Sequence, residues 1–426
     1  MSGGSPLLSG LRAQAAARQA PAAQTSEFGD PFAELPELVE IGVQLDTLAA
    51  LGLSLPFYRL NEGADAARAV VGGHELVSFA SYDYLGLNAH PAVQAAAQAA
   101  VARWGISAGA SRLVGGERPH HRRLEAALAR FQGTEDCLTF VSGHATNVTA
   151  IAALVGPDDL IITDALVHNS VAVGAQLSGA RRLTMPHGDT DWLDRELTRQ
   201  RGRARRVLIA VEGLYSMDGD VPDLARLVDI KQRHQAWLMV DEAHALGVLG
   251  ETGRGSAQHC GVDPRAVEVW MGTLSKTLAG CGGYICGSRS LITLLKARAS
   301  GFVYSVAMAA PVTAAAEAAL EVLAQAPHRV TRLQANSRRF LRGAQAAGLE
   351  TGRAAGAAVI PVMTGDSLTA LRLSAGLFAR GIFALPVVHP AVPERAARVR
   401  FFVTSEHTAA EIDRAVSETR AVLAAL

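Results

Sequence analysis

The sequence of 426 residues has little cysteine, no net charge and no long apolar run. Its four cysteines, Cys137, Cys260, Cys281 and Cys286, form no C-x-x-C pair. This argues against a zinc ribbon, a thioredoxin-type site or a disulfide framework, and it fits a reducing, cytoplasmic compartment. Forty basic residues balance forty acidic ones without a long run of either sign, so no broad surface for nucleic acid or an anionic membrane is expected. Because polar residues interrupt every span of about 18 residues, no transmembrane segment is expected.

Two motifs of nucleotide-binding enzymes are also missing. No G-x-G-x-x-G joins a first strand to a helix, and no Walker A string occurs, which removes the main support for nicotinamide or nucleoside-triphosphate binding. Residues 105–109 match G-x-S-x-G. However, a nucleophile elbow follows a strand and a helical pattern precedes this stretch, so a serine hydrolase is not expected.

The length provides for about two to three domains of ordinary size. Residues 1–35 are predicted to be a disordered tail. A transit peptide is the alternative, because the first 26 residues contain two arginines and no acid. We predict an N-terminal arm with a small-domain segment over 36–90, a large domain over 91–315 and a smaller C-terminal α/β domain over 316–426.

Short apolar runs alternate with helical stretches through the large domain. Such alternation predicts a mostly parallel sheet buried on both faces, and therefore an α/β fold. The expected strands lie within 137–143, 159–164, 206–213, 236–244, 267–276 and 282–287, with others within 357–365, 381–388 and 398–405. The expected helices cover 91–105, 120–133 and about 316–345, and residues 106–117 are expected to form a loop.

The polar residues that end these runs are the candidate functional residues, because ligands of an open parallel sheet bind beyond the carboxyl ends of its strands. Asp241 ends one run and His244 follows it. An aspartate there can stabilise a cationic ring nitrogen, although a helix-capping aspartate with an incidental histidine gives the same spacing. Lys276 follows another run among small and hydroxyl residues. Burial would lower its pKa towards the neutral amine that imine chemistry requires, but many lysines after strands are ordinary surface residues.

Three further strand ends add weaker signals. Gly143 and His144 begin a helical stretch whose free backbone N–H groups would suit a phosphate, and a plain tight turn is the alternative. His168 follows a fourth run, where a flat imidazole can stack on an aromatic cofactor or have a purely structural role. Glu212 and Ser216 follow a fifth.

Taken together, these candidate residues and the sequence around them resemble a fold-type I pyridoxal 5'-phosphate (PLP) enzyme, and within that group the α-oxoamine synthase family. The resemblance runs from about residue 57 to 420 and rests on the strings SYDYLGL, GASRLVGGE, SGHATN, LVHNS, VEGLYSMDGD, LMVDEAHALGVLGETGRG, MGTLSKTLAGCGGYICG and RVRFFVTSEHT. Within the family, the strings SYDYLG, LSGA and VEVWMGT with GGYI look most similar to the serine palmitoyltransferase catalytic subunit of sphingolipid synthesis and to polyketide-associated synthases. The branch of 8-amino-7-oxononanoate synthase commonly has asparagine where Tyr82 stands.

The resemblance implies a role for each candidate residue. Lys276 would bind the cofactor aldehyde, Asp241 would pair with its ring nitrogen, His244 would bond its phenolic oxygen and His168 would stack on its ring. The phosphate would be bound by Gly143, His144 and Thr273, and Ser216 would support the ring substituents. The substrate would be bound by Arg400 and Tyr82.

The implied reaction joins an amino acid to an acyl thioester, of coenzyme A or an acyl carrier protein, with loss of CO₂. Serine is favoured over alanine and glycine by the motif around Tyr82. The resemblance implies a homodimer with a shared active site, and it implies no metal cofactor. Val306 stands where many relatives have a threonine that reaches the phosphate across the dimer interface. The alternatives are 8-amino-7-oxononanoate synthase within the family, an aminotransferase or aldolase on the same scaffold, and a non-catalytic subunit, which would not need Lys276.

Overall fold

The computed structural model describes residues 30–426 as two compact units that divide after Arg59. Residues 1–29, most of the predicted disordered tail, lie outside the described part of the chain. In the first unit, helix α2 (Pro36–Ala50) begins with proline in its first turn, where the missing N–H has no intrahelical partner to lose. None of its residues is buried within this unit.

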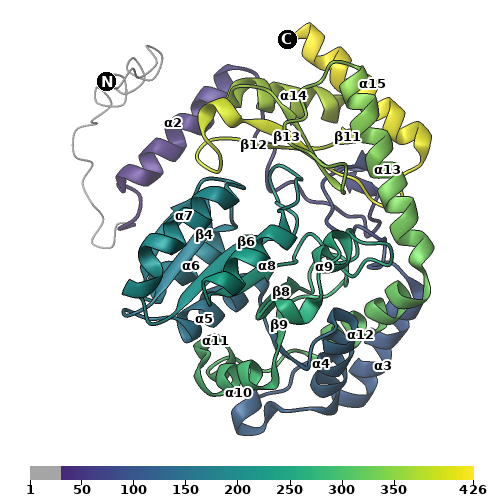
Figure 1. Cartoon of the computed structure of the whole chain (residues 1–426). Helices are drawn as coiled ribbons and strands as arrows, with labels where there is room; N and C mark the ends of the chain where they lie inside the picture. The colour runs from purple at the N-terminus through teal and green to yellow at the C-terminus, as the bar shows by residue number, and fades with distance from the viewer. Residues whose placement is uncertain (1–29) are drawn as a thin grey trace. The chain divides into compact units, whose positions relative to one another are not determined.

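A seven-stranded mixed sheet forms the centre of the second unit (Figure 1). Strand β9 is antiparallel to both of its neighbours, whereas the other neighbours pair in parallel. The expected mostly parallel α/β sheet is therefore confirmed. In spatial order the strands are β3 (Asp136–Phe140), β9 (Gly283–Gly287), β8 (Val269–Thr273), β7 (Trp237–Asp241), β6 (Val207–Glu212), β4 (Leu160–Asp164) and β5 (Arg181–Met185).

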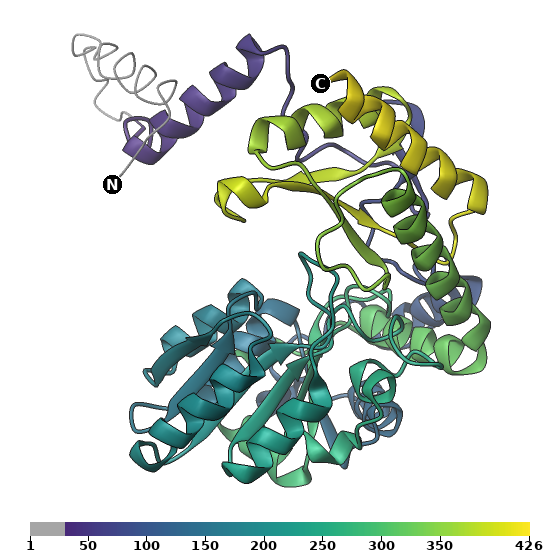
Figure 2. The same cartoon turned by 45° about the horizontal axis from the view of Figure 1, so that its top comes forward.

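Helices cover both faces of this sheet (Figures 1 and 2). Since side chains alternate along a strand, Ile209 packs into one core and Leu208 into the other. The Ile209 core includes residues of α4 (Pro119–Gln132), α7 (Thr190–Gln200), α8 (Leu224–Arg233) and α9 (Ser256–Cys260). The Leu208 core includes residues of α5 (Gly143–Leu154), α6 (Asn169–Leu177) and α10 (Arg289–Arg298), with α11 (Ser300–Val303) packed against it.

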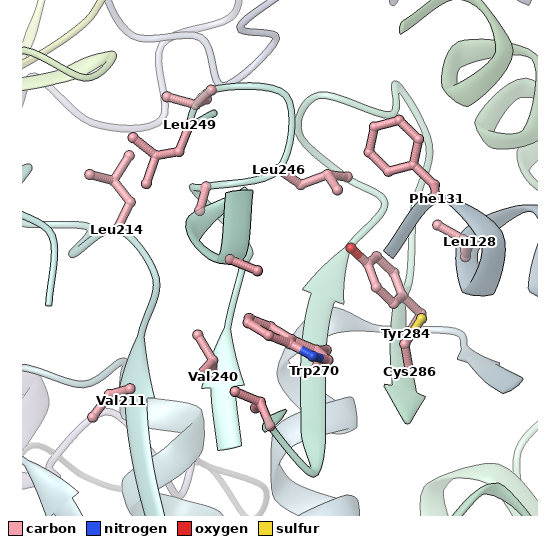
Figure 3. Close-up of a cluster of buried hydrophobic side chains, with 14 of the residues drawn as sticks. Leu128, Phe131, Val211, Leu214, Val240, Leu246, Leu249, Trp270, Tyr284 and Cys286 are labelled. Carbon is pink, nitrogen blue, oxygen red and sulfur yellow. The ribbon is translucent and has the colours of Figure 1, made fainter. Parts of the chain in front are cut away.

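Two large aromatic residues fix the strands that lead to the candidate lysine (Figure 3). Trp270 on β8 is fully buried, and its indole Nε1 donates a hydrogen bond of 2.8 Å to the carbonyl of Pro264. Tyr284 on β9 lies so close to Gly272 that a Cβ there would sit 2.2 Å from the tyrosine ring. Strand β8 therefore has little freedom to shift, and the residues that follow it are held in place.

The second unit also contains two small three-stranded sheets, one of which joins strands from both ends of the unit. Strands β10 (Val359–Met363), β13 (Arg398–Phe402) and β12 (Leu385–Val387) pair antiparallel, whereas β2 (His74–Ser78) pairs antiparallel with β1 (Arg68–Val71) and parallel with β11 (Ile382–Phe383). The remaining helices are α3 (Pro91–Trp104), α12 (Ala310–Gln325), α13 (Pro327–Ala346), α14 (Ser367–Ala379) and α15 (Ala409–Ala425). The domain boundaries given above remain a proposal.

The structure differs from the sequence-based expectation in three places. The helix expected over about 316–345 is two helices, because Pro327 cannot donate the hydrogen bond that a continuous helix needs. The expected loop over 106–117 contains a π-helical turn at Arg112–Gly116. Strands β1, β2 and β5 were not predicted. Among residues 30–426, no helix is both long and apolar enough to cross a membrane.

Candidate active site

A cavity of about 300 Å³ lies at the carboxyl ends of the central strands. It brings together residues that are far apart in the sequence. Eight of the ten predicted site residues line it, namely Gly143, His144, His168, Ser216, Asp241, His244, Thr273 and Lys276. The other two, Tyr82 and Arg400, contact residues of this group, as described below.

Asp241 ends strand β7, and its carboxylate is held by two donors. Oδ1 accepts a hydrogen bond of 2.9 Å from the backbone N–H of Ala243. Oδ2 accepts one of 2.8 Å from Nδ2 of Asn147 on α5, which also donates to Oγ of Ser170 at 2.9 Å. The side chain is almost fully buried. Such an arrangement fixes a negative charge in the cavity, ready to pair with a cationic group.

Lys276 follows strand β8 and places its amine in the same cavity. Burial lowers the pKa of Lys276 to about 8, an effect that the charges of Asp241 and Glu212 partly oppose. Its Nζ lies 5.6 Å from the ring centroid of Tyr82. A substantial fraction of this amine is therefore neutral near physiological pH, as a nucleophile or a base requires.

His244 is buried beside Tyr84, a contact that sequence reasoning missed. The hydroxyl of Tyr84 lies 2.6 Å from Nδ1 of His244. Burial holds the pKa of His244 well below its ordinary value, and the charges of Lys276 and Arg400 act in the same direction. His244 is therefore neutral, and the Tyr84 contact occupies Nδ1 and leaves Nε2 for a ligand.

His168 lies at the start of α6 with a defined tautomer. Its Nδ1 accepts a hydrogen bond of 3.2 Å from the backbone N–H of Ser170 and lies 2.7 Å from the Oγ of that residue. Burial lowers the pKa of His168, so the ring is neutral and its proton sits on Nε2. His168 can therefore donate a hydrogen bond from Nε2.

The start of helix α5 forms an anion site at one wall of the cavity. Ser142 caps the helix by accepting from the backbone N–H of Ala145 at 3.3 Å. The N–H groups of Gly143 and His144 lie in the first turn, where no intrahelical acceptor exists. A Cβ at Gly143 would lie 2.9 Å from Oγ1 of Thr273, so glycine permits this close approach. The helix end and the hydroxyl together suit a phosphate.

Arg400 on β13 presents its guanidinium beside Tyr82 and Ser216. Nη1 donates a 2.6 Å hydrogen bond to the carbonyl oxygen of Ser216, and Nη2 lies 3.5 Å from the hydroxyl of Tyr82. The guanidinium carbon lies 4.5 Å from the ring centroid of Phe402. Nε is buried and has no hydrogen-bond partner among the described residues. A guanidinium fixed in this way can bind a carboxylate in a bidentate manner.

Sequence comparison now gives this site a family. Residues 74–418 match the family described as aminotransferase class I and II. The chain is 43% identical to 8-amino-7-oxononanoate synthase of Anaeromyxobacter sp. (strain K), over 90% of this chain and 95% of that relative. It is 40% identical to the synthase of the same name from Geotalea daltonii, over 88% of this chain and 95% of the relative.

Structural comparison agrees. The fold is similar to a variant of serine palmitoyltransferase from S. paucimobilis with a bound PLP–myriocin adduct, with a TM-score of 0.88 and 26% identity over 93% of this chain and all of that one. The chain belongs to the α-oxoamine synthase family. As an α-oxoamine synthase it is a PLP-dependent acyltransferase, so the expected family, enzyme class and cofactor are confirmed.

The cavity of this α-oxoamine synthase fits PLP. It offers a buried carboxylate to a ring nitrogen, an amine to an aldehyde and a helix N-terminus to a phosphate. In addition, Oδ1 of Asn147 and Oε1 of Glu212 are buried without a hydrogen-bond partner in the described part of the chain. Buried polar atoms normally have a hydrogen-bond partner. Two such atoms without one are expected in a site that receives a polar ligand.

Several residues of the site were not predicted. Asn147, Tyr84 and Ser170 lie next to predicted residues and position them. Asn147 and Tyr84 stand within the strings SGHATN and SYDYLGL, so the signal was present in the resemblance although no role was assigned to them. Cys281 and Ser275 also line the cavity.

Proposed function

We propose that this α-oxoamine synthase condenses L-serine with an acyl thioester, releasing CO₂ and a free thiol and forming an α-amino ketone. The observation that carries this assignment is the Arg400 guanidinium held beside the Tyr82 hydroxyl, in the same site as the Lys276 amine. Arg400 would bind the carboxylate of the amino acid, and Tyr82 would offer its hydroxyl to the polar end of the substrate.

Each side chain then has a task in the condensation. When bound, PLP supplies an electron sink for the charge that forms at the α-carbon. The carboxylate of Asp241 would keep a proton on the ring nitrogen, and Nε2 of His244 would bond the phenolic oxygen. Lys276 would hold the cofactor in the resting enzyme, and its Nζ would remove the α-proton of the bound amino acid.

His168 and the end of α5 complete the arrangement. The neutral ring of His168 would stack on the cofactor and donate from Nε2 to the thioester carbonyl, stabilising the negative charge that grows on that oxygen. Gly143, His144 and Thr273 would hold the phosphate, and Ser216 would support the ring substituents while its carbonyl oxygen orients Arg400.

Alanine is the second candidate for the amino acid. The relatives at 40–43% identity carry the name 8-amino-7-oxononanoate synthase. In that product a methyl group neighbours the amine-bearing carbon, as it would after alanine is used. Serine and alanine differ by one hydroxyl, so Tyr82 is the residue to test. A site that bonds a substrate hydroxyl rejects the analogue without it far better than an apolar site rejects an added hydroxyl.

A titration tests the proposal. Purified PLP-loaded enzyme is mixed with serine, alanine and glycine in turn, and the visible absorbance of the cofactor is followed. CO₂ release is then measured with acyl thioesters of coenzyme A and of an acyl carrier protein. Release with serine that falls in Tyr82→Asn supports the assignment. Release with alanine and heptanedioyl thioester alone would establish the second candidate, and keto-acid formation without thioester would indicate an aminotransferase.

The active enzyme is proposed to be a cytoplasmic homodimer with a shared active site. An apolar surface supports the dimer. Its exposed side chains are Ile106, Leu113, Val114, Tyr304 and Val306, and a β-bridge joins Ser111 to Val306. Sedimentation equilibrium tests the dimer, and Leu113→Glu together with Val114→Glu should shift it towards monomer.

A further inference from the structure

A second buried carboxylate lies next to Asp241 and has no assigned task. Glu212 is the last residue of β6 and pairs in register with Asp241, the last residue of β7. Both side chains line the cavity and both are almost fully buried. Oε2 of Glu212 accepts a 3.0 Å hydrogen bond from the backbone N–H of Ser216, whereas Oε1 has no partner among the described residues.

The groups around Glu212 do not favour the ionised form of both Glu212 and Asp241 at once. Facing it are Asp241 from β7, Lys276 from the segment after β8, and the backbone N–H groups of Ser216 and His168. Lys276 is the one cation among these groups. Burial raises the pKa of Glu212 to about 8, and the charge of Asp241 adds to the effect. Two neighbouring buried carboxylates of this kind hold one proton between them.

The contacts of the two carboxylates decide which of them holds the proton. Asp241 has a donor on each oxygen, from Ala243 and Asn147. Glu212 has its Ser216 bond on Oε2 and an unpartnered oxygen, Oε1, in the cavity wall. A carboxylate that accepts on both oxygens is stabilised in its ionised form, while an oxygen with no donor is the natural site for a proton.

We propose that Glu212 is a neutral carboxylic acid in the resting enzyme, with Oε2 accepting from Ser216 and Oε1 carrying a hydroxyl that donates into the cofactor cavity. Asp241 then keeps the one negative charge of this strand pair. The inference rests on the proposed function only in taking PLP as the ligand that receives this donor. Glu212 is thus a cofactor-binding residue that contributes a hydrogen-bond donor and no charge.

Glutamine is the matched variant, because its amide has the same shape and the same donor and acceptor as a neutral glutamic acid. In Glu212→Gln the carbonyl can accept from Ser216 and the NH₂ can donate into the cavity. Glu212→Ala removes both functions. Asp241→Asn is the control that does remove a charge from beside Lys276.

The first measurement needs no cofactor. The infrared spectrum of the cofactor-free enzyme near neutral pH is compared with that of Glu212→Gln. A protonated-carboxyl carbonyl band that is present in the wild type and missing from the variant supports the proposal. Ionised-carboxylate bands lost in its place would overturn it. This result is independent of any turnover, so a failure of the serine assignment leaves it unchanged.

The second measurement uses the PLP-loaded enzyme. Visible absorbance is followed against pH, and PLP affinity is measured by equilibrium dialysis. A neutral Glu212 predicts that Glu212→Gln keeps the wild-type pH midpoint and binds PLP within about threefold of the wild type. Loss of one hydrogen bond in Glu212→Ala should weaken PLP by about tenfold. If Glu212→Gln shifts the midpoint as Asp241→Asn does, Glu212 carries a charge and the proposal is wrong.

Discussion

Nδ2 of Asn147 lies 2.8 Å from Oδ2 of Asp241, which joins the helix that begins at the anion site to the strand that supplies the carboxylate. The same amide group donates to Ser170, whose Oγ lies 2.7 Å from His168. The side-chain amide of Asn147 therefore orients the carboxylate of Asp241 directly. Through the hydroxyl of Ser170, it also orients the imidazole of His168. This relation makes Asn147 the first residue to test.

We expect Asn147→Ala to lower kcat by about 10- to 100-fold, because a hydrogen bond to a charged group is lost inside a buried site. The KM for the amino acid should change little, since Asn147 does not contact Arg400. Steady-state kinetics with both substrates measure the two constants. A fall in protein stability with normal kcat would mean that Asn147 serves the fold alone.

Lys276→Ala should abolish turnover and the visible absorbance of the lysine-bound cofactor while the fold persists. Thermal unfolding and circular dichroism serve as the control for folding. In the wild type, the rate of PLP uptake should rise with pH and level off above about 8, because burial lowers the pKa of Lys276 to about 8 and the neutral amine is the reactive form. A rate that keeps rising to the ordinary lysine pKa of 10.5 would contradict this.

Arg400 should govern the affinity for the amino acid. Removing the guanidinium group in Arg400→Ala should raise the amino-acid KM by roughly 10- to 100-fold and leave the thioester KM nearly unchanged. Arg400→Lys keeps the charge without the bidentate geometry, so its effect should be intermediate. Initial-rate measurements with each substrate varied in turn distinguish these cases. Equal effects on both KM values would place the carboxylate site elsewhere.

His187 should make the stability of the enzyme depend on pH on the alkaline side. Its Nδ1 and Nε2 each lie 2.8 Å from a carboxylate oxygen, of Asp164 and Asp220 respectively. Although burial opposes the charged form, bonds to these carboxylates raise the pKa of His187 from 6.5 to about 9. The protonated ring therefore stabilises the folded state fully below pH 6.5, and this contribution is lost as the pH rises through about 9.

The shift corresponds to about 3 kcal/mol of unfolding free energy. Urea unfolding between pH 6 and pH 10, at roughly one-unit steps, measures the loss. His187→Asn should be less stable at the acid end and should show a flatter profile. A wild-type profile that is flat across this interval would show that the pair of aspartates does not hold a charged imidazole.

The sequence was a better guide to the residues that end strands than to those that support them. Asp241 and Lys276 stand at abrupt changes from apolar to polar residues, a local pattern that can be read along the chain. Tyr84 and Asn147 carry no such pattern. Their partners are 160 and 94 positions away, so only the folded chain shows the contacts.

The same reasoning explains the outcome for the fold. Buried strands of the central sheet are continuous apolar runs and were predicted. Strand β5, at the sheet edge, reads RRLTM and leaves mostly exposed or half-buried side chains, so hydrophobicity did not distinguish it from a loop. The break between α12 and α13 depends on one proline within an otherwise helical pattern.

The parallel pair of β2 and β11 joins residues about 300 positions apart, and every strand of the large sheet lies between them in the sequence. During synthesis from the N-terminus, all seven strands of that sheet leave the ribosome before β11 does. Until then, the edge of β2 that pairs with β11 in the folded chain has no partner. Unpaired strand edges of this kind can pair with other chains. Closure of this small sheet is thus a late step, because β2 gains its partner β11 only after about 300 further residues have been synthesised.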